Sequence, residues 1–361
     1  MERKVRAKRA TLKSIASALG VTPTSVSNAY NNPAKVSREL RERIIEHAHS
    51  VNYDGPHPTA RSLRTGRCGA IGVLFNDPLS YAFTDAHDIT FLRGISSVCE
   101  EKGANIVLIP LKNSRPEQRD TLTAMVDGYI LNAPYKSHPT IRAALMRGLP
   151  TVVVDFDAPE FASVQTNDRE MMRAVTAHLL ALGHRRVAIV TFPRSEGDGE
   201  IVSLDRNFSE ENYVVHERIA GCREAFDAGQ VPLEGILVCE MQNNEDGGKQ
   251  AAERLLHRRP DLTALICFSD RLARGAIAHC LAAGLAVPQH ISVTGFDGLD
   301  PPGHQPQAIR LTTVRQNAFE KGRKAAELLM REGGAGVLKA WIRAELVIGE
   351  SSARAWESRD Q

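Results

Sequence analysis

The sequence lacks the features that would place the chain in a membrane or outside the cell. Among its 361 residues, no apolar run approaches the roughly 20 residues that a membrane-spanning helix requires. The basic N-terminal segment leads into an amphipathic helical pattern, without the apolar core and cleavage site of a signal peptide. Hydrophobic residues (42%) and charged residues (24%) occur at ordinary frequencies. We therefore expect a globular protein of the cytoplasm, long enough for two or three domains.

The sequence also has few cysteines and none of the common catalytic motifs. It contains no Cys-x-x-Cys pair and no cysteines and histidines at zinc-finger spacing, so we expect buried free thiols and no metal site. The phosphate-binding loop, the H-E-x-x-H and G-x-S-x-G motifs, and G-x-G-x-x-G after a strand are all missing. An enzyme is therefore disfavoured and no cofactor is expected, although α/β folds carry many activities. The six cysteines are Cys68, Cys99, Cys222, Cys239, Cys267 and Cys280.

Positive charge is concentrated near the start of the chain. Residues 1–67 contain 13 Lys and Arg against 5 Asp and Glu, a net charge of +8. The whole chain carries +2, which leaves −6 for the remainder. A basic module joined to an acidic body is typical of proteins that bind nucleic-acid phosphates with one domain only.

Residues 11–52 show a helical pattern throughout. Apolar residues at i, i+3, i+4 and i+7 predict a first helix over 11–19, with Gly20 just past its end. A second helix begins at once, because Thr22 is a good N-cap and Pro23 suits the first helical position; a third follows Ser37. Two short helices joined by a tight turn have helix-turn-helix geometry. A purely structural helix pair gives the same pattern, but the short hydroxyl and amide side chains around the turn favour phosphate binding.

Beyond residue 69 short β-branched runs alternate with amphipathic stretches. This alternation predicts βαβ units with parallel sheets, and eight runs are too many for one sheet, so we expect two subdomains with a cleft. Ligands of open α/β sheets bind outside the carboxyl ends of the strands. The polar segment 193–212 is expected to be a mobile loop. The predicted strands are 70–75, 105–110, 128–132, 151–156, 186–192, 236–239, 264–268 and 291–296.

These segments together resemble the LacI/GalR family, the lactose-repressor-like regulators. TLKSIASALGVTPTSVSNAYNN is similar to the family's helix-turn-helix signature, NYDGPHPTARSLRTGR to its hinge and GAIGVLF to its first core strand. HLLALGHRRVAIV, ERIAGCREAF, FSDRLARGAI, ISVTGFDG and LTTVRQ then follow in family order. The resemblance covers nearly the whole chain. It implies an all-α helix-turn-helix head and a two-lobed α/β body like that of type I periplasmic binding proteins, with parallel sheets.

The resemblance also implies the domain boundaries. A helix-turn-helix domain is expected in 1–55, a hinge in 56–68, and an effector-binding and dimerisation body in 69–352. Within the body, we expect an N-lobe of about 69–167 and 316–337 and a C-lobe of about 168–315 and 338–352.

DNA-binding residues follow from the same resemblance. Pro23, Thr24 and Asn28 match the base-facing positions of the recognition helix. Leu63 matches a hinge leucine that is wedged into the minor groove, with a packing leucine as the alternative. The segment Gly-Pro-His-Pro places one residue more than usual before Leu63. The basic hinge residues Arg61 and Arg64 are expected to contact DNA as well, and the expected phosphate contacts are Thr11, Thr22, Ser25, Ser27 and Asn31.

In the body, the resemblance implies an effector cleft. Arginine and aspartate placed together can form forked hydrogen bonds to adjacent hydroxyls, as on a sugar. Asp270 could equally be only a helix N-cap. The matching positions are Asp155, Arg218, Ser269, Asp270, Asp297 and Gln316. Loop placement alone adds Asp77, Tyr81, Phe83 and Tyr213, each of which could equally be a surface or hinge residue.

These observations predict a DNA-binding transcription regulator, by family habit a repressor, that senses a sugar-like small molecule. A dimer bound to a two-fold symmetric operator is expected, because one helix-turn-helix recognises only a half-site. A pure solute-binding protein is the remaining alternative, since the body resembles periplasmic sugar binders. The basic head and the missing export signal disfavour it.

Asn28 provides a test of the DNA-binding assignment, because many family members have Arg at this position. An amide binds N6 and N7 of adenine, whereas a guanidinium binds O6 and N7 of guanine. We predict that Asn28→Arg changes the preferred base at one half-site position, with about 1–3 kcal/mol at stake per bidentate pair. Selection of bound sequences from a random DNA pool measures this preference. An unchanged preference would remove Asn28 from base recognition.

Overall fold

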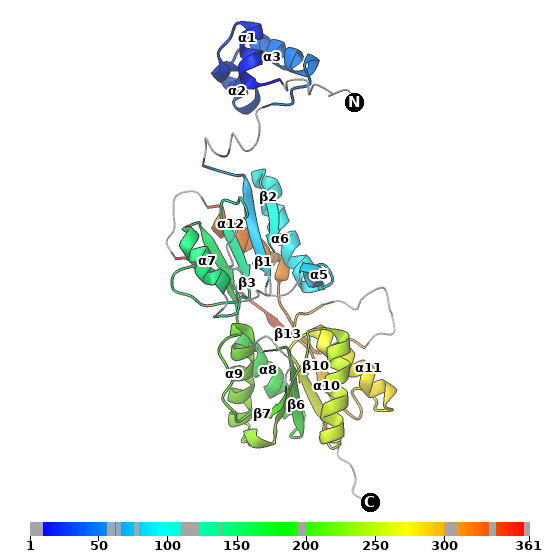
Figure 1. Ribbon diagram of the computed structural model, residues 1–361. Coiled ribbons are helices and arrows are strands. Elements are labelled where there is room, and N and C mark those ends of the chain that lie inside the picture. Colours follow the sequence, from blue (N-terminus) through cyan, green and yellow to red (C-terminus); the bar gives the residue numbers. More distant parts are fainter. Residues whose placement is uncertain are drawn as a thin grey trace, which may run out of the picture. The chain divides into compact units, whose positions relative to one another are not determined.

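The computed structural model describes residues 10–55, 62, 66–75, 79–109, 123–137, 139–193, 200–299, 309–331 and 337–356. The chain divides into two compact units, Met1–Gly69 and Ala70–Gln361, which we call the head and the body (Figure 1). None of the described helices has the length and apolar character of a membrane span. The described cysteines are all free thiols, and all except Cys68 are buried.

The head is a bundle of three short helices, as the sequence predicts. Thr11, Thr22 and Ser37 are the N-caps of the three helices, and each side chain accepts a hydrogen bond from a backbone N–H of the first turn. Gly20 ends the first helix in the left-handed conformation, with φ at 67°. The elements are α1 (Leu12–Leu19), α2 (Pro23–Asn31), η1 (Pro33–Lys35) and α3 (Arg38–Ser50), and their buried core contains Ile15, Ala16, Val26, Ala29, Ile44 and Ala48.

The N-lobe of the body is built on a six-stranded parallel sheet in the order β12-β5-β4-β3-β1-β2. Side chains alternate along β1: Ile71, Val73 and Phe75 pack towards α6 and α12, whereas Leu74 packs on the other face with residues of α7. The elements are β1 (Ala70–Phe75), α5 (Leu79–Ala82), α6 (Ala86–Lys102), β2 (Asn105–Ile109), β3 (Tyr129–Asn132), α7 (Pro139–Arg147), β4 (Thr151–Val154), β5 (Ala162–Thr166), α12 (Ala318–Leu329) and β12 (Lys339–Ile342).

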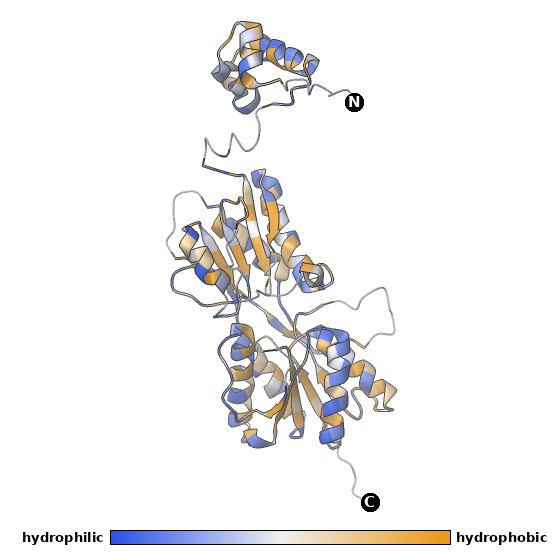
Figure 2. Cartoon of the chain, in the orientation of Figure 1, coloured by the Kyte–Doolittle hydropathy of each residue, from blue (hydrophilic) through white to orange (hydrophobic). Residues whose placement is uncertain are grey.

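The C-lobe contains a five-stranded sheet in the order β10-β9-β6-β8-β7, covered on both faces by helices. All its strands pair in parallel except β7, which runs antiparallel to β8. Figure 2 shows hydrophobic strands and helices with hydrophilic outer faces. The elements are α8 (Asp168–Ala181), β6 (Val187–Thr191), β7 (Ile201–Ser203), α9 (Tyr213–Ala228), η2 (Leu233–Gly235), β8 (Leu237–Glu240), α10 (Glu245–Arg258), β9 (Ala264–Cys267), α11 (Asp270–Ala282) and β10 (Ser292–Thr294).

The chain passes between the lobes three times. The first crossover joins β5 to α8, the second contains β11 (Thr313–Arg315), and the third joins β12 to β13 (Glu345–Val347). The antiparallel pair β11 and β13 ties the second crossover to the third. Asn167 of the first crossover accepts a hydrogen bond from the backbone N–H of Ala344, at 3.0 Å. The three crossovers are therefore bonded to one another rather than independent hinges.

Two sequence-based expectations need correction. The segment 193–212 is not entirely loop, because β7 lies within it and pairs with β8. The segment 338–352 does not belong to the C-lobe alone, because β12 pairs with β5 at the edge of the N-lobe sheet. Both strands are short and lie at sheet edges, where one neighbour suffices and the hydrophobic pattern is weak. The eight predicted strands are confirmed, and no end differs by more than two residues.

Helix packing in the N-lobe depends on glycine. A Cβ at Gly94 of α6 would lie 2.0 Å from the carbonyl oxygen of Phe319 in α12. We predict that Gly94→Ala forces the two helices apart and lowers the stability of the body by about 1–3 kcal/mol, despite the better helix propensity of alanine. Gly235→Ala is the matched control, because no atom lies within 4 Å of its Cβ position. Thermal unfolding of both variants measures the difference, and equal stability would contradict the close-packing argument.

Candidate functional site

A pocket lies between the lobes of the body, at the carboxyl ends of the parallel strands. Its cavity volume is about 130 Å³, and the pocket is partly open to solvent. Phe75 at the end of β1, Asn132 at the end of β3 and Asp155 directly after β4 line it from the N-lobe. Phe192 after β6 and Phe268 after β9 line it from the C-lobe. Open α/β sheets bind ligands at this edge, outside the carboxyl ends of their strands.

A chain of buried polar groups crosses the pocket floor. Lys321 of α12 is fully buried, and its Nζ atom lies 2.6 Å from Asp155 Oδ2 and 2.6 Å from Gln316 Oε1. Gln316 in turn donates a hydrogen bond to Asp297 Oδ1, at 2.7 Å. Lys321 belongs to the N-lobe, Gln316 to the second crossover and Asp297 to the end of the C-lobe sheet. The network therefore connects both lobes at the base of the pocket.

Both aspartates of this network have unusual backbone angles. The φ angle is 48° at Asp155 and 122° at Asp297. Residues other than glycine rarely adopt positive φ, and such positions cluster at ligand sites. Burial raises the pKa of Asp297 to about 6, while His87 and Arg218 oppose that rise. Asp297 therefore combines an unusual backbone conformation with a carboxyl group whose pKa lies above the usual range.

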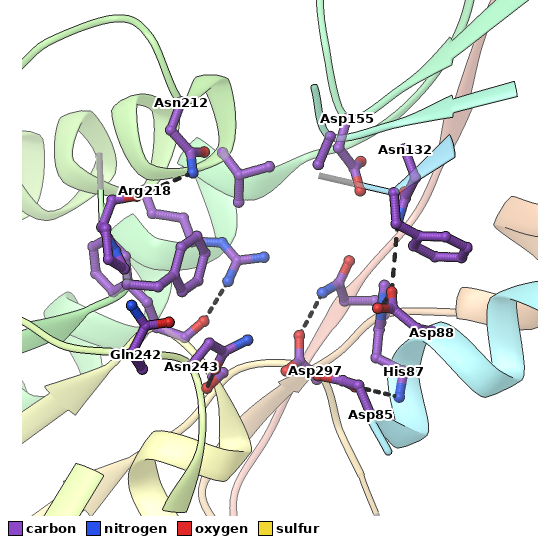
Figure 3. Close-up of a pocket in the computed structure, with 18 of the residues that line it drawn as sticks. Asp85, His87, Asp88, Asn132, Asp155, Asn212, Arg218, Gln242, Asn243 and Asp297 are labelled. Atoms are coloured by element: carbon purple, nitrogen blue, oxygen red, sulfur yellow. Dashed lines mark hydrogen bonds and ion pairs between the residues drawn. The ribbon is translucent and has the colours of Figure 1, made fainter. Parts of the chain in front are cut away.

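Arg218 of α9 supplies a fixed cation opposite these carboxylates. Its Nε atom donates to Asp168 Oδ1 at 2.7 Å, and Nη1 donates to the carbonyl oxygen of Phe268. The guanidinium carbon lies 3.5 Å from the centre of the Phe296 ring, in a cation–π contact. Figure 3 shows Arg218 on one side of the pocket and Asp155 and Asp297 across from it. Arginine and aspartate thus converge on one space from different elements.

Ser269 and Asp270 follow the same strand but have different roles. Ser269 lines the pocket, is the N-cap of α11, and donates to Asn243 Oδ1 at 2.5 Å. Asp270 does not line the pocket: it accepts hydrogen bonds from Thr313 Oγ1 at 2.5 Å and from the backbone N–H of Leu299 at 2.6 Å. Burial raises its pKa to about 7. Asp270 is therefore neither a pocket residue nor the N-cap; it holds the β11 crossover against α11.

Two of the candidates chosen by loop placement, Phe83 and Tyr213, do not line the pocket. Phe83 is 61% exposed and does not line it. The Tyr213 ring packs against Phe156, with centroids 6.4 Å apart, and burial raises its pKa. Tyr81 lies in α5, and its side chain falls outside the described part of the chain, as does all of Asp77.

A second group of N-lobe residues at the pocket was not predicted. Asp85 is the N-cap of α6 and forms an ion pair with Arg271 of the C-lobe at 3.2 Å. His87 Nδ1 lies 3.6 Å from Asp88 Oδ1, and the buried Nε2 atom of His87 has no hydrogen-bond partner among the described residues. Burial lowers the pKa of His87, but Asp88 and Asp297 outweigh it and leave that pKa raised. The sequence signal was the run Asp-Ala-His-Asp at a helix start.

The head presents the predicted DNA-binding residues at the start of α2. Thr22, Pro23 and Thr24 are exposed, whereas Asn28 is partly buried. The Thr22 and Ser25 hydroxyls are hydrogen-bonded to each other at 3.0 Å. Thr11 is also exposed, and Ser27 and Asn31 are joined by a side-chain hydrogen bond. The hinge candidates Arg61, Leu63 and Arg64 lie outside the described residues.

Family models match both units of the chain. Residues 11–55 match the model described as "Bacterial regulatory proteins, lacI family", and residues 176–352 match that of a "Periplasmic binding protein-like domain". An HTH-type transcriptional regulator of Mycolicibacterium smegmatis is 36% identical, over 96% of this chain and 97% of its own. The HTH-type transcriptional regulator IpsA of Corynebacterium glutamicum is 38% identical, over 89% and 90%.

Solved structures give the same result for the fold. A LacI family regulator from Corynebacterium glutamicum has a TM-score of 0.68 at 30% identity, covering 97% of this chain and 100% of its own. The regulator CelR in complex with cellobiose has a TM-score of 0.68 at 22% identity, with coverage of 95% and 100%. The lac repressor dimer bound to operator and the anti-inducer ONPF has a TM-score of 0.76 at 22% identity, with coverage of 96% and 100%.

The Lys321–Asp155 pair gives a stability prediction. Lys321→Met leaves the Asp155 carboxylate, 7% exposed, without its ammonium partner. We predict a loss of about 3–5 kcal/mol, because an uncompensated buried charge is costly. The double variant Lys321→Met/Asp155→Asn should recover most of that loss, since it removes both charges. Denaturant unfolding of the body measures both values; a double variant no more stable than Lys321→Met would show that the charge is not the cause.

Proposed function

Because the chain belongs to the lacI family of bacterial regulatory proteins, we propose that it is a transcriptional repressor controlled by a sugar-like molecule in the cleft of its body. The family assigns the chain a DNA-binding head and an effector-binding body. One observation carries the proposal further: Arg218, Asp155 and Asp297 converge on a single pocket from both lobes.

This arrangement suits a ligand with several adjacent hydroxyls. The Arg218 guanidinium donates hydrogen bonds, and the carboxylates of Asp155 and Asp297 accept them. Gln242 and Asn243 add amides, each able to donate and accept, to the same wall. Phe192 and Phe268 provide apolar faces against which a ring can pack. The cellobiose complex of CelR, which shares this fold, is consistent with a sugar in the pocket.

The head supports sequence-specific DNA binding by a dimer. Its exposed α2 residues Thr22, Pro23 and Thr24 lie at the helix start, which a helix-turn-helix presents to the major groove. One head contacts a half-site, so a homodimer on a two-fold symmetric operator satisfies the geometry. The lac repressor, which shares this fold, binds its operator as a dimer in its crystal structure, and this agrees with the proposal.

Effector control requires two states of the body with different ligand affinities. Contacts between the lobes would favour one of them: Arg271 with Asp85 at one side of the cleft, and Lys136 with Glu210 at the other, at 3.0 Å. A ligand that binds one state more tightly shifts the equilibrium by its differential affinity. We propose that this shift changes the affinity of the chain for its operator.

The experiment separates sensing from DNA binding. Asp297→Asn keeps the size of the side chain and an oxygen for Gln316 but removes the charge. We predict that operator binding without ligand stays within about twofold, while the response to ligand is lost, because the acceptor for ligand hydroxyls is weakened. Asp157→Asn is the control, since Asp157 is exposed and pairs with Lys339 at the surface.

Fluorescence anisotropy of a labelled operator, found by selection from random DNA, measures both quantities with a panel of mono- and disaccharides. The proposal fails if no panel member changes the operator affinity of the parent chain. It also fails if Asp297→Asn loses operator binding but keeps ligand binding, because the sensing and DNA-binding roles would then be reversed.

A further inference from the structure

The cations around the pocket are already paired with carboxylates. The pairs are Arg218 with Asp168, Lys321 with Asp155 and Arg271 with Asp85, at N–O distances of 2.7, 2.6 and 3.2 Å. All three carboxylates are buried. The positive charge that these described residues bring to the wall is therefore compensated before any ligand enters.

Two further carboxylates on the wall, Asp88 and Asp297, have no Lys or Arg ion-pair partner among the described residues. Asp88 accepts a hydrogen bond from Asn132 Nδ2 at 3.4 Å, and Asp297 accepts one from Gln316 Nε2 at 2.7 Å. Among the described lining residues, only His87 can add another positive charge, and it lies beside Asp88. Even with His87 protonated, the five described carboxylates around the pocket outnumber its four cations by one.

The protonation state of His87 bears on which chemical groups this wall can bind. Its Nε2 atom is buried on the pocket wall without a hydrogen-bond partner among the described residues. A neutral imidazole with its proton towards Asp88 presents Nε2 as an acceptor, and a protonated imidazole presents it as a donor. A hydroxyl can donate to the first and accept from the second. An ionised phosphate can only accept, so it matches one of the two states.

We infer that the pocket selects an uncharged polyhydroxyl ligand and excludes the phosphate ester of the same compound. The inference rests on the proposed effector role of the cleft and specifies the charge of its ligand. A phosphate dianion would enter a partly desolvated space beside Asp88 and Asp297, and the cations of the described wall are already paired. Like charges repel more strongly there than in water. Hydroxyls, in contrast, donate to these carboxylates without a charge penalty.

The test compares matched pairs of probes on the full-length chain. D-ribose, D-glucose and myo-inositol are titrated by calorimetry at pH 7.5, each beside its monophosphate ester. At least one neutral probe should bind, and its ester should bind at least about 100-fold more weakly, the size expected for a close like-charge contact at a partly buried site. An ester that binds as tightly as its parent overturns the inference. Binding of no neutral probe also counts against it.

A variant of Asp88 tests whether negative charge on the wall is what excludes the phosphate ester. Asp88→Asn should reduce the ratio of the two affinities, neutral probe over its ester, by about tenfold. The variant removes one repelling charge while keeping a polar partner for Asn132. Asp227→Asn, on the exposed face of α9, should leave this ratio unchanged. An equal affinity ratio in the unmutated chain, Asp88→Asn and Asp227→Asn would show that charge on the wall is not what excludes the ester.

Operator anisotropy with the same probes distinguishes this inference from the proposed function. An ester that binds and changes operator affinity would overturn the charge selection and leave the regulator function intact. A neutral probe that binds with the expected selectivity but never changes operator affinity would support the charge selection and contradict the regulator function.

Discussion

The buried chain Asp155–Lys321–Gln316–Asp297 is the interaction on which the rest of the body depends. It joins the N-lobe sheet to the C-lobe sheet through two 2.6 Å contacts of one ammonium group and a 2.7 Å hydrogen bond. Burying Lys321 completely is costly unless its charge and its donors are satisfied, so this position fixes Asp155 and Gln316 in place. The positions of the side chains at the floor of the pocket are thus set by the need to pair the buried Lys321 charge as well as by packing.

The lobes are held together by contacts of two kinds. The crossovers are bonded to one another through β11, β13 and Asn167, so the lobes cannot separate at one crossover alone. The contact between Lys136 and Glu210 is of a different kind. Lys136 and Glu210 are largely exposed, and exposed ion pairs contribute little stability. A ligand that bridges Arg218 and Asp297 can therefore shift the lobe equilibrium without breaking the floor.

The sequence was a good guide where a residue's position followed from strand ends or helix caps. Asp155 and Asp297 were predicted from the family resemblance, and both stand at the ends of predicted strands. Thr22 was predicted as a helix cap and, from the resemblance, as a phosphate contact. Lys321 was missed because a lysine in an amphipathic helix normally faces solvent. Asp85, His87 and Asp88 were missed because they start a helix that follows a loop. β5 and β12 were missed because Ala162–Thr166 and Lys339–Ile342 are short and partly polar, and only their neighbours make them strands.

The central claim is that the cleft and the operator-binding head share one equilibrium, and thermodynamic reciprocity tests it most directly. The neutral polyol that binds the free chain most tightly is titrated by calorimetry into the full-length chain alone and into the chain saturated with operator. The account predicts that operator changes the affinity for the polyol by the same factor, and in the same direction, as the polyol changes the affinity for operator. Identical polyol affinities with and without operator would contradict it.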